Sequence, residues 1–122
     1  MLSRLEDTLF STAFIGTGGS GPGLTWINAK GGIKSLSLES SVYTGDMDLE
    51  KNRMAIGTKN GCVYILSISK SDKGGLSVDI DSRFFVSAGV TSVCFAGDDR
   101  VVIADTAART LLWQISDPGG TC

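Results

Sequence analysis

Hydrophobic and polar residues alternate over short stretches of this chain, and glycine-rich or charged turns separate the stretches. Between Ile33 and Leu38 the residues alternate with a period of two, which is the signature of a β-strand. A helical period of useful length does not occur anywhere in the sequence. The pattern therefore predicts an all-β chain. We expect strands over 12–17, 24–28, 33–38, 43–49, 54–58, 62–68, 90–95, 101–104 and 110–115, and one or two strands within 76–80 and 83–87.

Two further features of the pattern bear on the fold. Lys59-Asn60-Gly61 predicts a hairpin turn, because Asn and Gly both tolerate positive φ angles. The strand that follows, 62–68, is apolar on both faces, so we expect other elements to cover it on two sides. Residues 1–8 fit either a short helical turn or a frayed end.

The strand-like stretches repeat along the chain. Ile15-Gly16-Thr17 recurs as Ile56-Gly57-Thr58, and periods of about 40 to 50 residues are typical of β-propeller blades. A bulky apolar residue lies downstream in each unit, and we expect these residues to be structural, packing between adjacent blades: Trp26, Leu66 and Trp113.

The last unit, 90–116, resembles a WD repeat. Val93-Cys94-Phe95 matches the end of its first strand, a Gly-Asp turn and a strand of small residues follow, and Trp113 precedes Gln114 where the family has Asp. The middle unit is similar, with Leu66 at the Trp position, and the first unit resembles the last three strands of a blade, with Trp26 at that position. The chain has no histidine, so the family's Gly-His dipeptide and its Asp-His-Ser/Thr-Trp network are incomplete.

The resemblance implies an all-β fold of antiparallel four-stranded blades, an incomplete WD-type propeller. It would extend over residues 1–122, with blade-like units at about 9–41, 42–88 and 89–117. The spacing of the strands alone fits a small β-sandwich or barrel equally well.

A propeller has four to eight blades, which is more than this chain can form. We therefore expect missing sequence, copies of the chain or a partner protein to complete the ring. The function implied is a non-catalytic scaffold for protein–protein interaction. Its expected contact residues lie in the turns between the second and third strands of a blade: Lys59, Asn60, Thr106 and Arg109. The polar loop 69–75 is a second candidate.

Charge and cysteine content narrow the range of expected partners and cellular locations. The net charge of −2 gives no electrostatic reason to expect nucleic acid or an anionic membrane as partner. The longest apolar runs, about six residues, are too short to span a bilayer. The three cysteines form no CxxC, and Cys62 and Cys94 read as small core residues. We expect an intracellular protein of the cytoplasm or nucleus.

Sites for chemistry are few. Without histidine, a Ser-His-Asp triad, a Cys-His pair and a His-ligated metal are excluded, so we expect no enzyme activity, cofactor or metal. The alternating acids Asp46, Asp48 and Glu50 read as an exposed strand or loop face. The alternative function is a ligand- or nucleotide-binding β domain that uses the Gly16–Gly23 loop, which matches GxGxxG. A dinucleotide site would also need a helix after the last glycine, whereas a β-like run follows.

Overall fold

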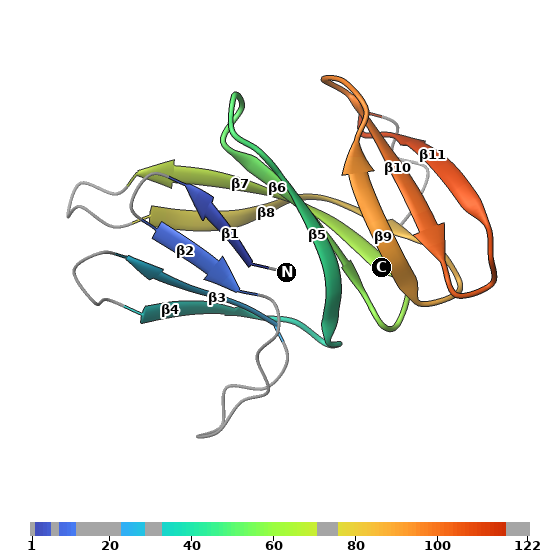
Figure 1. Ribbon diagram of the computed structural model, residues 1–122, viewed down its shortest axis with the longest axis horizontal. Coiled ribbons are helices and arrows are strands. Elements are labelled where there is room, and N and C mark those ends of the chain that lie inside the picture. Colours follow the sequence, from blue (N-terminus) through green and yellow to red (C-terminus); the bar gives the residue numbers. More distant parts are fainter. Residues whose placement is uncertain (1, 6–7, 12–22, 29–32, 71–75, 117–122) are drawn as a thin grey trace.

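The described part of the chain consists of strands and their connections. The computed structural model describes residues 2–5, 8–11, 23–28, 33–70 and 76–116, with side chains over 36–69 and 77–116. Within these ranges there are eleven strands and no helix (Figure 1). The strands are β1 (Leu2–Leu5), β2 (Thr8–Ser11), β3 (Gly23–Asn28), β4 (Ile33–Ser37), β5 (Val42–Asp48), β6 (Arg53–Thr58), β7 (Cys62–Lys70), β8 (Leu76–Phe85), β9 (Val90–Phe95), β10 (Arg100–Asp105) and β11 (Thr110–Gln114).

The strands form three antiparallel sheets, each built from neighbours along the chain. The first sheet has the order β1-β2-β3-β4, the second β5-β6-β7-β8 and the third β11-β10-β9. In Figure 1 the second sheet lies between the other two. The prediction of an antiparallel all-β chain is confirmed, whereas the described strands do not close into a barrel.

Some strand predictions need correction. The interpretation of residues 1–8 as a helical turn or frayed end is wrong, because β1 lies there and pairs with β2 from Leu2↔Ser11 to Leu5↔Thr8. Of the one or two strands expected within 76–80 and 83–87, the structure has one, β8, which ends at Phe85 and whose pairing with β7 shifts register between Ile65 and Leu66. The strand expected at 12–17 lies outside the described residues.

The second sheet is covered on both faces, as the two apolar faces of the strand 62–68 predict. One face packs with Leu36 and Leu38 at the end of the first sheet, through a cluster that consists of Val42, Met54, Ile56, Cys62, Tyr64, Leu66 and Ile68. The opposite face packs against the third sheet through Ala55, Val63, Ile65, Val86, Val90, Val93, Val101, Ile103 and Trp113. Because full burial of one such aliphatic or aromatic side chain contributes about 1.5–3 kcal/mol, these two clusters hold the three sheets together.

The bulky residues of the repeat take part in this packing. Leu66 is buried in the first cluster. Trp113 is only 4% exposed and lies in the second, with its ring stacked on Phe84 of β8 at 5.2 Å between ring centroids. Trp26 lies in β3, opposite Phe10 and Lys34, and its side chain is outside the described set.

Cys62 is buried as expected, but the prediction that Cys94 is a core residue is wrong. Side chains alternate along β9, so Val93 faces the second sheet and Cys94 faces away from it. The apolar character of both residues in the sequence concealed which of them would point inward.

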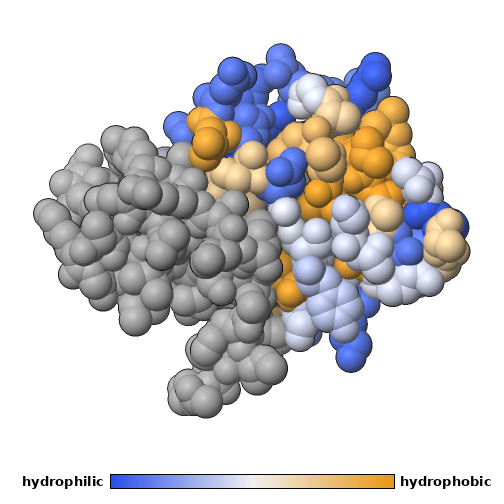
Figure 2. All heavy atoms as spheres, in the orientation of Figure 1, coloured by the Kyte–Doolittle hydropathy of each residue, from blue (hydrophilic) through white to orange (hydrophobic). Residues whose placement is uncertain are grey.

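The third sheet is open on its outer side among the described residues. It has three strands, and β11 has a neighbour on one edge only. Asp105 N–H donates to Arg109 and Ile115 N–H donates to Asp99, so by alternation the backbone groups of Leu112 point away from β10. Figure 2 shows hydrophobic residues gathered over the part of the molecule where the third sheet lies.

Candidate functional site

Three connections meet at one end of the second and third sheets. We call them the turn surface: the β6–β7 turn (59–61), the β8–β9 connection (86–89) and the β10–β11 turn (106–109), at the lower right of Figure 1. Gly89 joins them, because its carbonyl accepts a hydrogen bond from Thr106 N–H at 2.8 Å. A β-carbon on Gly89 would lie 2.8 Å from the Lys59 carbonyl oxygen. The turns of Lys59 and Thr106, distant in sequence, are therefore neighbours.

The β6–β7 turn is the hairpin that Asn60-Gly61 predicts, with one difference. Gly61 has φ +94°, whereas Asn60 is not among the described residues with positive φ. The Thr58 hydroxyl accepts the Cys62 N–H at 3.0 Å and donates to the Asn60 side-chain oxygen. A β-carbon on Gly61 would lie 2.7 Å from the Val86 carbonyl oxygen, so glycine is needed here for both space and conformation.

The β10–β11 turn repeats this geometry with different residues. Asp105 stands where Thr58 does, and its Oδ1 accepts the N–H groups of Ala107 and Arg109, both at 3.0 Å. Ala108 stands where Gly61 does and has φ +61°, which is costly for a residue with a β-carbon. The sequence gives no sign of this equivalence, because Asp-Thr-Ala-Ala lacks the glycine of Thr-Lys-Asn-Gly.

Arg109 anchors the β10–β11 turn. Its guanidinium lies 2.8 Å from Asp105 Oδ2 and donates to the Ser87 hydroxyl at 3.1 Å. The hydrogen bond from the Arg109 backbone N–H, followed by the bond and charge of its side chain, lowers the pKa of Asp105 against the opposing effect of burial. Arg109 therefore fixes the turn while about half of its side chain stays exposed.

The four predicted contact residues thus lie on one surface. Lys59, Asn60 and Thr106 are exposed, and Lys59 has no ion-pair partner in the described part of the chain. Ser40 and Ser41 also belong to this end, since the Asn60 N–H donates to the Ser40 hydroxyl and the Lys59 N–H to the Ser41 carbonyl. Sequence reasoning missed these serines because they come from the connection between β4 and β5.

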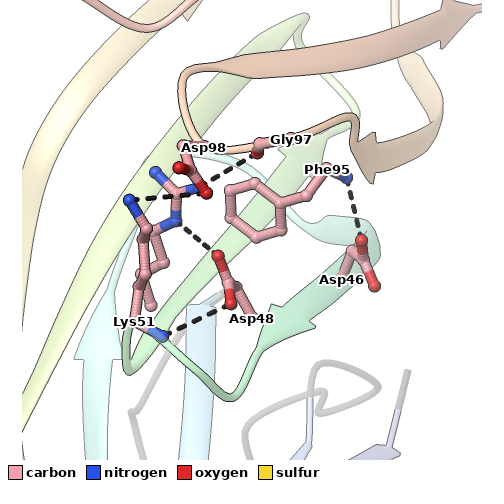
Figure 3. A network of polar contacts seen from close by, with 7 residues as sticks. Asp46, Asp48, Lys51, Phe95, Gly97 and Asp98 are labelled. Atoms are coloured by element: carbon pink, nitrogen blue, oxygen red, sulfur yellow. Dashed lines mark hydrogen bonds and ion pairs between the residues drawn. The ribbon is translucent and has the colours of Figure 1, made fainter.

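The acids Asp46 and Asp48 do not form an exposed face, contrary to the expectation. Asp46 accepts the Phe95 N–H at 2.9 Å, and the largely buried Asp48 binds Arg53 Nε at 2.9 Å (Figure 3). Burial alone would raise the pKa of Asp48, but its bonds to Arg53 and the Lys51 N–H bring it below the ordinary value. Asp46 joins the second sheet to the third, Asp48 holds Arg53 within the second sheet, and Glu50 is exposed as expected.

The described parts of the remaining candidates yield no site. In the described segments no group of three His, Cys, Asp or Glu side chains could hold a metal ion. Residues 12–22 of the Gly16–Gly23 loop and 71–75 of the polar loop lie outside the described set. Gly23 begins the strand β3, and no helix follows the loop as a dinucleotide site requires.

Comparison with protein-family models and with curated proteins finds no match for this chain. The likeness to a WD repeat thus stays a prediction from the residues quoted above. Among the described residues no helix is long and apolar enough to cross a membrane.

Proposed function

We propose that this chain is a non-catalytic scaffold for protein–protein interaction. In this proposal it forms part of a WD-type β-propeller, with blade-like units at about 9–41, 42–88 and 89–117. The remaining blades come from further sequence, from copies of the chain or from a partner. The observation that carries the proposal is the outer side of the third sheet, which no other described element covers.

That outer side has the character of an interface. Cys94 and Leu112 both pair with Val102 across β10, so the three side chains form one apolar strip. Leu112 is 60% exposed. The second sheet has similar apolar residues on both faces, and each face is covered by another sheet. An apolar face beside an unpaired edge favours association, and a fourth strand or a further sheet would cover both.

The turn surface suits binding because its backbone is held in place. Hydrogen bonds tie the β10–β11 turn to Gly89 and the β6–β7 turn to the connection before β5. Binding residues are often found on loops that a rigid scaffold positions. We therefore propose Lys59, Asn60, Thr106 and Arg109 as contact residues for a protein partner. The free thiols of Cys62 and Cys94 support an intracellular location.

The mass of the purified chain in solution, measured by light scattering together with its thermal melt, tests the proposal. We expect a defined oligomer or aggregation. Leu112→Lys should lower the mass, because it places a charge in the apolar strip. Thr110→Lys adds the same charge on the same face of β11, but at a position that is already polar, and should change little. The proposal of an incomplete propeller would be refuted if the chain were a monomer with a sharp thermal melt and Leu112→Lys changed neither its mass nor its melt.

A further inference from the structure

A groove lies at the opposite end of the sheets from the turn surface. It has a volume of about 390 Å3 and runs between residues 47–50, at the end of β5, and Phe95, Gly97 and Asp98, where β9 leads to β10. The β5–β6 and β9–β10 turns lie at the top of Figure 1, and in Figure 2 this part of the surface is hydrophilic at the tips with hydrophobic residues below.

The two walls of the groove are held together by polar contacts. The Arg53 guanidinium stacks on the Phe95 ring, 4.5 Å from its centroid, and donates to the Gly97 carbonyl at 3.3 Å. Its Nε binds Asp48, and Lys51 Nζ lies 3.5 Å from Asp98 (Figure 3). These contacts hold the β5–β6 turn beside the β9–β10 turn.

The lining combines apolar side chains with carboxylates. Met47, Leu49 and Phe95 supply the apolar part, and Leu49 is 58% exposed to solvent. The described lining residues include three acids, and the bases Arg53 and Lys51 contact two of them from beside the groove. Arg53 neutralises Asp48, whereas Glu50 has no ion pair among the described residues. The Asp98 side chain is 82% exposed, so its pair with Lys51 is weak and open to exchange.

We propose that this groove binds a segment of a protein partner in which Lys or Arg alternates with apolar residues. The apolar side chains would pack on Leu49 and Phe95, and the cations would meet Glu50 and Asp98. Charge complementarity selects this partner, because an acidic segment would be repelled and a neutral apolar one would leave both carboxylates unused. The inference rests on the proposed scaffold and gives it a second contact surface. This surface does not depend on which residues or chains supply the remaining blades.

The test is fluorescence anisotropy of a labelled peptide Lys-Leu-Arg-Val-Lys titrated with the full chain. Glu50→Gln combined with Asp98→Asn should weaken binding about fivefold or more, since each exposed ion pair contributes modestly. Leu49→Ser should weaken it as well. Asp79→Asn combined with Asp81→Asn is the matched control, because it removes two exposed acids from β8 and should leave the affinity unchanged.

Several results would overturn the proposal. These are equal losses with both pairs of variants, equal affinity for Glu-Leu-Glu-Val-Glu, no measurable binding, or a calcium-dependent thermal shift that is lost with Glu50→Gln and Asp98→Asn. The elution volume of the same sample in size-exclusion chromatography reports self-association through the third sheet. The anisotropy titration therefore tests the groove, and the elution volume separately tests the proposed scaffold.

Discussion

Trp113 connects the third sheet to the second, and its removal should be the most damaging single truncation on β11. The side chain is 4% exposed, belongs to the cluster between the two sheets and stacks on Phe84. The change Trp113→Ala would leave a void there, because the strands on both sides are held by their own hydrogen bonds and can close in only partly.

The expected magnitude follows from the buried area. A tryptophan side chain buries up to about 250 Å2, which at about 25 cal/mol per Å2 corresponds to about 6 kcal/mol as an upper limit. A compact unfolded chain already hides part of this area, which brings the expected loss to about 3–5 kcal/mol. For a domain of this size that is a fall in Tm of roughly 10–20 °C.

Urea denaturation followed by circular dichroism measures the change, with Thr110→Ala as the matched control. Thr110 lies on the same strand as Trp113, faces the outer side and is exposed and polar, so its truncation should cost less than about 1 kcal/mol. If the two variants lost equal stability, or Trp113→Ala lost less than about 1 kcal/mol, the packing of the third sheet on the second would be refuted.

Two further predictions concern the β10–β11 turn. Ala108→Gly should stabilise the chain by about 0.5–1 kcal/mol, because relief of the left-handed strain outweighs the larger unfolded-state entropy of glycine; a lower urea midpoint would contradict this. The pKa of Asp105 is lowered in the folded state, so its contribution is complete above the ordinary value of about 3.9 and is lost as the pH falls through the folded-state value. Asp105→Asn should therefore flatten the loss of stability between about pH 5 and pH 2, measured by urea titration at each pH, and an unchanged slope would count against the pairing with Arg109.

Much of the fold was predictable because short-range rules determine it. The strands after residue 23 follow from alternation, and the β6–β7 hairpin follows from Asn60-Gly61. The two apolar faces of 62–68 predict cover on both sides, since an uncovered face would leave apolar side chains in water. Whether the three sheets belong to a ring could not be derived, because this depends on residues or chains beyond them.

The candidate sites were less predictable because they depend on contacts between distant segments. The spacing of Asp46 and Asp48 predicted an exposed face. In the structure Asp46 accepts a hydrogen bond from the Phe95 N–H, and Asp48 forms an ion pair with Arg53. Nothing near Phe95 in sequence indicates that its N–H meets a carboxylate of β5. Ala108 has a left-handed backbone conformation that the sequence does not indicate, because the stretch around it contains no glycine. Side-chain contacts of this kind arise only once the sheets stack.

The burial of the second sheet on both faces also has a consequence for the order in which the molecule opens. Each sheet of a stack contacts only its neighbours, so stability is close to a sum of single-sheet terms and interface terms. Among the three sheets described, the second alone shares two interfaces, and β6 and β7 lie at its centre. The flanking sheets can therefore detach one at a time, and the amides of β6 and β7 should be the last to exchange with solvent.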